Sequence, residues 1–334
     1  MIPGTAELRQ VPVWQAELAG AITDPAELLE LLGLSPEWLS AARAASRQFP
    51  LRVPRGFVAR MRRGDPHDPL LRQVLPLAEE MVLVEGYSAD PVGDGAAMTT
   101  PGVLQKYAGR ALLTATGACA VHCRYCFRRH FPYSEANAAA DHWSAALAGI
   151  AADTSLREVI LSGGDPLALS DRRLGEFIEA LAPLAHIERL RLHTRLPVVL
   201  PERATPGLVR LLENARPKTV VVLHVNHPAE INNEVRSACA RLIDSGAMLL
   251  NQSVLLRGVN DNAETLADLS EVLFATGVLP YYLHQLDRVA GAAHFEVSDD
   301  RARVLHTELQ ARLPGYLVPR LVREVAGASG KTPL

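Results

Sequence analysis

Three cysteines lie close together in the middle of the chain, as Cys119, Cys123 and Cys126. Their spacing is C-x3-C-x2-C, with no fourth cysteine nearby. Thiolates are the ligands of iron–sulfur clusters, and a four-iron cluster held by three thiolates leaves one iron open to another molecule. The cysteines follow a short apolar, β-prone run at residues 111–117. The pattern therefore predicts a cluster-binding loop at the C-terminal end of a strand, where α/β folds carry their chemistry.

Two other chemistries are open to these cysteines. A structural zinc ion could be bound by the three thiolates with His122 or His130, although zinc ribbons usually contain a second C-x2-C pair, which this sequence lacks. A disulfide fits less well, because three clustered cysteines cannot pair off and nothing marks the chain as secreted. The remaining cysteine, Cys239, shares an apolar helical face with Val235 and Leu242, which predicts a buried structural thiol.

Lysine is rare in this chain, since only Lys106, Lys218 and Lys331 are lysines among 34 basic residues. Each lysine is therefore a candidate for a task that arginine cannot perform, foremost the formation of an imine with an aldehyde cofactor. Lys331 lies beside Gly330 and other small residues, which would give a bulky planar cofactor access. An exposed lysine in a flexible tail is the alternative.

The bulk composition restricts the class of protein. With 334 residues, 48% of them hydrophobic and 21% charged, the chain can form one large α/β domain and a smaller unit. No apolar run is as long as a membrane span, and the first residues lack the features of a signal peptide. A net charge of −3 gives no general attraction to nucleic acid or to acidic lipid. We therefore expect a cytoplasmic protein with no membrane or nucleic-acid partner.

From about residue 108 onward, β-prone runs alternate with amphipathic helical stretches, which predicts parallel βα units. Six units are too few to close an eight-stranded barrel, so the predicted fold is α/β, an open (β/α)6 partial TIM barrel. Residues 1–100 are read as a mainly helical and irregular N-terminal region, and residues 101–334 as the core. The six strand candidates are residues 111–117, 158–163, 188–194, 219–225, 247–254 and 279–286.

Polar residues follow several of these strands, and parallel strands present their C-terminal ends at one mouth. The second candidate ends in Gly163, Gly164 and Asp165. Two glycines allow the backbone to approach a ligand closely, and the carboxylate can accept a hydrogen bond from a cation. The sixth candidate leads to Asp287, which could instead cap a helix or pair with a surface cation. Such a polar ring on an apolar scaffold is typical of a small-molecule site.

Taken together, these residues resemble the lysine 2,3-aminomutases, radical S-adenosylmethionine (SAM) enzymes that also use pyridoxal 5′-phosphate (PLP). The resemblance covers roughly residues 100–334. The N-terminal part resembles one branch of the family, which makes (R)-β-lysine for attachment to elongation factor P. The segments that resemble the family are residues 106–110, the cysteine loop, 162–166, 195–203, 251–261, 280–287 and 330–331. The segments that resemble the branch are residues 51–55 and 65–75.

The resemblance implies three cofactors and the residues that bind them. Cys119, Cys123 and Cys126 would bind a [4Fe–4S] cluster whose open iron chelates SAM. Lys331 would carry PLP through an imine. The residues implied to lie near SAM are Gly163, Gly164, Asp165 and Gln252. Lys106 and Arg110 would face the PLP phosphate.

The resemblance also implies how the substrate binds. Arg128 would take the α-carboxylate of lysine, for which a bidentate guanidinium is a fitting partner. Asp287 and Glu324 would hold the distal ammonium. The family usually has aspartate where this chain has Glu324, and the extension that supports oligomers in fermentative aminomutases is absent, so an oligomer cannot be carried over.

The activity implied is the isomerisation of L-α-lysine to (R)-β-lysine, with the product passed to a ligase that acts on elongation factor P. A glutamate or arginine 2,3-aminomutase would share the cofactors, although the acidic pair favours a substrate with an amine at its tip. A zinc-stapled binding protein of the translation apparatus is the alternative outside enzymes.

Overall fold

The computed structural model describes residues 12–139 and 143–334, and in these residues the strands form one ten-stranded sheet. The spatial order of the strands follows the sequence order, and the sheet keeps two free edges. Strands β3 to β9 pair in parallel, and β1, β2 and β10 are antiparallel additions at the edges. The strands are β1 (Met98–Thr100), β2 (Val103–Leu104), β3 (Arg110–Thr116), β4 (Glu158–Gly163), β5 (Arg189–Thr194), β6 (Lys218–Leu223), β7 (Met248–Val254), β8 (Leu279–His284), β9 (Arg320–Arg323) and β10 (Thr332–Pro333).

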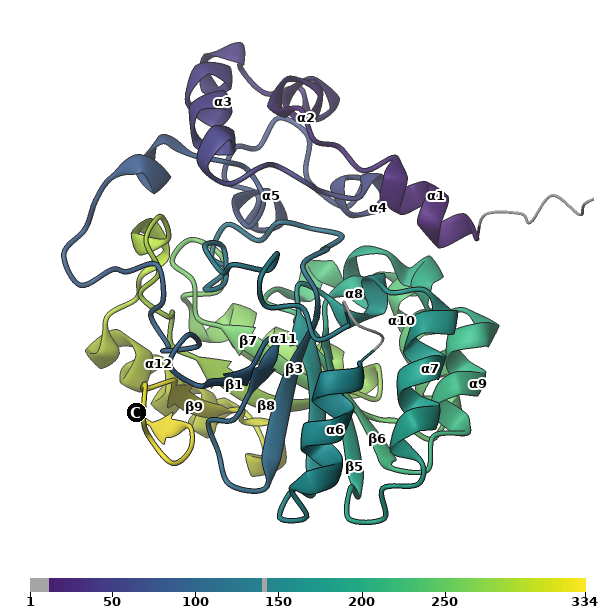
Figure 1. Ribbon diagram of the computed structural model, residues 1–334. Coiled ribbons are helices and arrows are strands. Elements are labelled where there is room, and N and C mark those ends of the chain that lie inside the picture. The colour runs from purple at the N-terminus through teal and green to yellow at the C-terminus, as the bar shows by residue number, and fades with distance from the viewer. Residues whose placement is uncertain (1–11, 140–142) are drawn as a thin grey trace, which may run out of the picture.

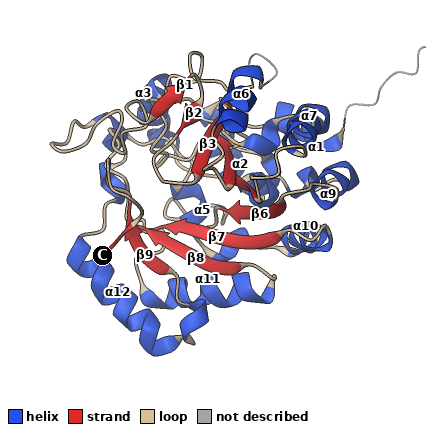
Figure 2. Cartoon of the chain, turned by 60° about the horizontal axis from the view of Figure 1, so that its bottom comes forward, coloured by secondary structure: helices blue, strands red, loops and turns tan. Residues whose placement is uncertain are grey.

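Helices connect the parallel strands and cover the outer face of the curved sheet (Figures 1 and 2). The prediction of an open (β/α)6 partial barrel is confirmed. Near the C-terminus the sheet gains a seventh parallel strand, because β9 pairs in parallel with β8. The helices of this part are α6 (Ser144–Ala152), α7 (Asp171–Leu181), α8 (Leu196–Val199), α9 (Pro206–Glu213), α10 (Asn233–Asp244), α11 (Ala263–Ala275) and α12 (Asp299–Arg312).

Side-chain caps fix where these helices begin. The Asn232 and Asn262 side chains accept hydrogen bonds from the backbone amides of Val235 and Thr265, at 3.0 and 2.8 Å, and so start α10 and α11. Such caps satisfy backbone donors that the first helical turn leaves free. The predicted structural thiol, Cys239, is fully buried in α10. The strands between the helices contribute buried apolar side chains to the core, among them Leu161, Leu192 and Val221.

The N-terminal region lies over the C-terminal ends of the strands (Figure 1). Its contact is direct, because the Arg60 Nη1 donates a hydrogen bond of 2.7 Å to the carbonyl of Glu230, which follows β6. Residues 1–11, on which the signal-peptide reading depends, lie outside the described residues. The boundary at residue 100 stays a prediction. The helices of this region are α1 (Val13–Ala19), α2 (Pro25–Leu32), α3 (Leu39–Gln48), α4 (Arg55–Val58) and α5 (Pro69–Arg72).

A long loop, residues 82–97, leads from the helices of the N-terminal region to β1. It lies along the loop that follows β8, because the Ser88 amide donates to the carbonyl of Arg288 at 3.0 Å and the Ala290 amide donates to the carbonyl of Ser88 at 2.8 Å. The loop begins with exposed residues and ends by burying Asp94, which is 2% exposed. In the described residues, no helix is long and apolar enough to cross a membrane.

Candidate active site

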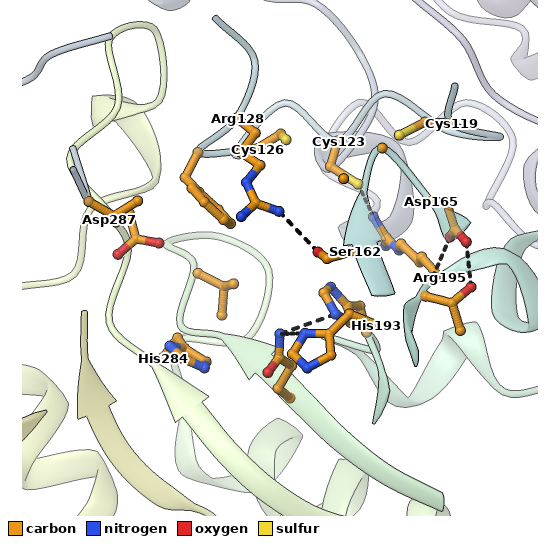
Figure 3. Close-up of a pocket in the computed structure, with 18 of the residues that line it drawn as sticks. Cys119, Cys123, Cys126, Arg128, Ser162, Asp165, His193, Arg195, His284 and Asp287 are labelled. Atoms are coloured by element: carbon orange, nitrogen blue, oxygen red, sulfur yellow. Dashed lines mark hydrogen bonds between the residues drawn. The ribbon is translucent and has the colours of Figure 1, made fainter. Parts of the chain in front are cut away.

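A cavity of about 370 Å³ lies at the C-terminal ends of the parallel strands. This volume lies within the range of small-molecule sites. Figure 3 shows the cysteine loop at one end of it and Asp287 at the other. Every residue to which the sequence assigned a role lines this cavity: Lys106, Arg110, Cys119, Cys123, Cys126, Arg128, Gly163, Gly164, Asp165, Gln252, Asp287, Glu324 and Lys331.

The three thiols belong to the loop that leaves β3, and none of them forms a disulfide. A tight turn, in which the Cys126 amide donates to the carbonyl of Cys123 at 3.0 Å, brings two of them together. Burial and the neighbouring Cys123 raise the pKa of Cys126 to about 11. Burial and the same two thiols, together with Asp165, also raise the pKa of Cys119 well above its ordinary value. Three thiolates that disfavour one another in this way suit a cationic group bound between them.

The two histidines of the zinc alternative contact the backbone of other loops. The Nδ1 of His122 lies 2.8 Å from the carbonyl of Pro50, and the Nε2 of His130 lies 3.1 Å from the carbonyl of Ala290. Among residues 12–139 and 143–334, no three His, Cys, Asp or Glu side chains are placed as ligands of a single metal ion. These contacts do not favour a Cys3His site.

Glycine is required where β4 meets the cysteine loop. Gly163 has a φ of +112°, and a Cβ added there would lie 2.7 Å from the carbonyl oxygen of Thr116. A Cβ on Gly164 would collide with the backbone of Ala118. The amide of Gly164 in turn donates to the Thr116 carbonyl at 2.7 Å. The two glycines therefore let the end of β4 lie directly against the loop that carries the thiols.

The Asp165 carboxylate is used by the fold. One oxygen accepts hydrogen bonds from the Leu167 amide at 3.0 Å and the Thr194 hydroxyl at 2.7 Å, and the other from the amides of Arg195 and Leu196 at 2.7 and 3.0 Å. Burial raises the pKa of Asp165 to about 6, against the effect of these donors. The geometry favours a carboxylate that positions the ends of β4 and β5. Its direct contact with SAM stays a prediction.

Charged groups gather at the far end of the cavity around Glu324. Its carboxylate forms an ion pair with Lys331, accepts a hydrogen bond from the Tyr107 hydroxyl at 2.8 Å and lies 3.6 Å from the Nζ of Lys106. Burial opposes ionisation, but Lys331, Tyr107 and Lys106 together hold the pKa of Glu324 below its ordinary value. Both lysines with assigned roles therefore lie beside this carboxylate.

Sequence reasoning missed Asp94, which connects the two ends of the cavity. Its carboxylate lies 2.6 Å from the Nε of Arg128 and 2.6 Å from the Nζ of Lys106. Burial opposes the charge, but Arg128 and Lys106 lower the pKa of Asp94. The Nη1 of Arg128 donates a further hydrogen bond to Ser162 at 3.0 Å, as Figure 3 shows. The only signal in the sequence was a carboxylate inside a turn-rich loop, and such a loop has no periodicity that would place it.

The remaining charged residues are less constrained. Among the described residues, none forms an ion pair with Asp287, and burial raises the pKa of Asp287 to about 7, although Lys331 opposes the shift. The Arg110 guanidinium lies over the Tyr107 ring, 5.0 Å from its centre. A half-buried carboxylate without an ion-pair partner can accept a cationic group from a ligand.

Histidines line the floor of the cavity between its two ends. The Nε2 of Gln252 lies 3.1 Å from the Nε2 of His224 and 3.5 Å from the Nδ1 of His193. Burial lowers the pKa of His224 to about 4 and the pKa values of His193 and His284 well below the ordinary value. In the described structure, the Nε2 atoms of His193 and His284 are buried without a hydrogen-bond partner. These neutral rings can offer polar contacts to a bound molecule.

Comparison with known proteins assigns the chain to a family. It is 51% identical to the L-lysine 2,3-aminomutase of Escherichia coli over 322 residues, which covers 96% of this chain and 94% of that protein. It is 47% identical to the enzyme of the same name from Haemophilus influenzae, over 99% of this chain and 98% of that protein. The chain belongs to the L-lysine 2,3-aminomutase family. It is therefore an isomerase, as the sequence resemblance predicted.

A more distant L-lysine 2,3-aminomutase, from Clostridium subterminale, is 34% identical over 96% of this chain and 77% of that protein. No family model matches the chain. Among solved structures, a radical SAM methyltransferase from Sphaerobacter thermophilus matches with a TM-score of 0.48 and 19% identity, over 69% of this chain and 72% of that chain. The strand order and the parallel pairing establish the open partial barrel.

Proposed function

We propose that this aminomutase converts L-α-lysine to (R)-β-lysine with a [4Fe–4S] cluster, SAM and PLP. The observation that carries the proposal is the content of the cavity, which is lined by three thiols together with a guanidinium, two carboxylates and a lysine. A radical source and the anchors of an amino acid with two ammonium groups would thus share one cavity.

The residues of the cavity fit these groups. When bound, the cluster and SAM supply a radical that removes a hydrogen atom, and PLP supplies the π-system through which nitrogen migrates. Cys119, Cys123 and Cys126 would hold the cluster. Lys331 would carry PLP through its Nζ. The residues proposed to contact SAM are Gly163, Gly164, Asp165 and Gln252. Lys106 and Arg110 are proposed to contact the PLP phosphate.

Polar side chains that line the cavity would bind and orient the substrate. Arg128, held by Asp94 and Ser162, would present its guanidinium to the α-carboxylate. Asp287 and Glu324 would bind the distal ammonium. The ion pair between Glu324 and the Lys331 ammonium supports this assignment, because it places an ammonium group against the same carboxylate. Two opposed anchors fix which carbon–hydrogen bond faces the radical.

The proposal extends to the use of the product. We infer that a ligase attaches the β-lysine to elongation factor P, and that both reactions occur in the cytoplasm. The support is the resemblance of residues 51–55 and 65–75 to that branch of the family, together with the near-complete overlap with the enzymes from E. coli and H. influenzae.

An anaerobic assay tests the proposal. The protein is reconstituted with iron, sulfide and PLP, then incubated with SAM, dithionite and L-lysine, and β-lysine is analysed by chiral chromatography with mass detection. (R)-β-lysine is the expected product. Cleavage of SAM without β-lysine would contradict the substrate assignment, and a protein that binds zinc instead of iron would contradict the whole proposal. A parallel reaction contains elongation factor P to which α-lysine has already been attached. Conversion of this attached lysine, and not of free lysine, would contradict the assignment of free lysine as the substrate.

A further inference from the structure

A buried arginine reaches one of the three thiols from behind. Arg195 follows β5, and its Nη1 donates a hydrogen bond of 2.8 Å to the Sγ of Cys123 (Figure 3). The residue is only 5% exposed. A guanidinium remains charged at any pH at which proteins are studied, so this contact places a full positive charge beside the sulfur.

A buried carboxylate balances that charge on the side away from the thiols. The Nη2 of Arg195 lies 2.9 Å from an oxygen of Glu230 and donates to the Oε1 of Gln73 at 2.6 Å. Glu230 and Gln73 are fully buried. The other Glu230 oxygen accepts from the backbone amides of Asn226 and His227 at 2.9 and 3.1 Å. The carboxylate is therefore fixed and cannot turn toward the sulfur.

Further hydrogen bonds make this a rigid network. The Nδ2 of Asn226 donates to the Tyr125 hydroxyl at 2.6 Å and to the Oε1 of Gln73 at 2.9 Å. Tyr125 belongs to the cysteine loop, Asn226 follows β6, and Gln73 ends α5 in the N-terminal region. Buried networks of this kind hold their members in one arrangement. The N-terminal region thus helps to fix where the guanidinium meets the thiol.

The physical consequence concerns electron transfer. The reduction potential of an iron–sulfur cluster depends on hydrogen bonds to its sulfur atoms and on nearby charge. A cationic donor on a ligand sulfur stabilises the reduced state, which carries one more negative charge. A carboxylate behind the donor opposes this effect.

We propose that Arg195 is a positioning residue that raises the reduction potential of the cluster, and that Glu230 sets the size of the effect. This inference rests on the proposed function only in that the three thiols must bind a cluster. A role in folding alone would make both residues matter for stability. A role in tuning the potential requires that their removal shift it in opposite directions.

The test measures the midpoint potential of the reconstituted protein by electron paramagnetic resonance during a redox titration, without SAM or lysine. Iron and sulfide content are measured first. In Arg195→Gln, the ratio of reduced to oxidised cluster at a fixed potential is expected to fall about tenfold, which corresponds to a shift of about 59 mV for one electron. In Glu230→Gln, the shift is expected in the positive direction.

Arg203→Gln is the matched control. Arg203 is also fully buried, but it binds the carbonyl of Leu167 and the carboxylate of Asp171 rather than a thiol. We expect this variant to lose stability and to keep the wild-type potential. Arg195→Lys keeps the positive charge and is expected to stay close to the wild-type potential.

The outcomes separate the two proposals. Wild-type protein that binds no cluster would contradict the proposed function, and this inference with it. A loaded wild-type protein whose Arg195→Gln and Glu230→Gln variants keep its potential, or shift in the same direction, would overturn the inference alone. If Arg195→Gln binds no cluster, Glu230→Gln decides, because a positive shift supports the inference and an unchanged or negative one overturns it.

Discussion

The sulfur end of the cavity is enclosed by segments from four parts of the chain, whereas the carboxylate end is formed by a loop and a tail that lie partly at the surface. Gln73, Glu230 and Arg195, behind the thiols, are 0%, 0% and 5% exposed. At the other end, Lys331 follows a tail whose residues 325–327 are exposed, and Asp94 ends a loop that begins with exposed residues. The difference suggests that rigidity was needed where the radical source is held, and access where cofactor and substrate enter.

The two ends also differ in how charge is satisfied. Arg195 at the sulfur end is bound to fixed acceptors that belong to the protein. At the carboxylate end, Asp287 has no ion-pair partner within the described parts of the chain, and Glu324 contacts the lysine that is proposed to carry PLP. The first arrangement holds a geometry, and the second leaves charge for a ligand.

Loss of a thiol should have the largest effect. In Cys123→Ala, iron is expected to fall from about four atoms per chain to below one, and activity should be lost, because two thiolates do not hold a four-iron cluster. Iron analysis checks this. Cys239→Ser, which changes a buried thiol away from the cavity, should keep its iron. Equal iron loss in both variants would show that folding, and not ligation, is responsible.

Loss of Lys331 should affect PLP binding at one end of the cavity and leave the iron at the other end unchanged. In Lys331→Ala, the absorbance of the PLP imine is expected to disappear while the iron content remains, because the lysine and the thiols lie at different ends of the cavity. The visible spectrum and iron analysis provide both readings. Lys218→Ala, at an exposed position where β6 begins, is the control. Imine absorbance that persists without Lys331 would remove this residue from its assigned role.

Asp94→Asn tests the connection between the ends. Because Asp94 is buried and pairs with both Arg128 and Lys106, removing its charge takes from both cations the carboxylate that lies nearest to them. Breaking a buried pair in this way costs about 3–5 kcal/mol of the free energy of unfolding. Chemical denaturation measures the change. The exposed Asp300 serves as the control, where asparagine should change the free energy by less than about 0.5 kcal/mol. Equal effects would mean that the Asp94 pairs are not formed.

Asp287→Asn should have the smallest effect on stability, and it should increase the stability, whereas Asp94→Asn decreases it. The pKa of Asp287 is raised to about 7, so the folded protein binds a proton there more tightly than the unfolded chain, and stability falls as pH rises from about 4 to about 7. Asparagine removes this loss. The melting temperature of the variant without ligands should therefore exceed that of the wild type by a few degrees at pH 8, and by less at pH 5. The KM for lysine should rise. A variant that is less stable at pH 8 would contradict the assignment.

The sequence predicted the fold well where local pattern and global fold agree. Alternating β-prone and amphipathic runs indicated the parallel strands, and residue types at their ends indicated the cavity. The sequence did not reveal that β9 joins the sheet in parallel, because a short β-like run carries no sign of its partner. Asp94 and the partners of Arg195 could not be predicted either, since their contacts join residues that are far apart in the chain.

The Asp165 carboxylate shows a different limit. Its position beside Gly163 and Gly164 was predicted, but the sequence could not show that four hydrogen bonds from its own fold would occupy the side chain. Residue type gives the chemistry that a group can perform, whereas only the structure shows whether its donors and acceptors are already in use.

The central claim is that both ends of the cavity act on one lysine molecule. The most direct measurement is the transfer of label from L-lysine deuterated at C3, incubated anaerobically with SAM, PLP, dithionite and the reconstituted protein. Mass spectrometry of recovered 5′-deoxyadenosine and β-lysine is expected to show deuterium in both products. If SAM is cleaved but the recovered 5′-deoxyadenosine carries no deuterium, the claim is contradicted, because the radical source would then not reach the lysine held at the other end.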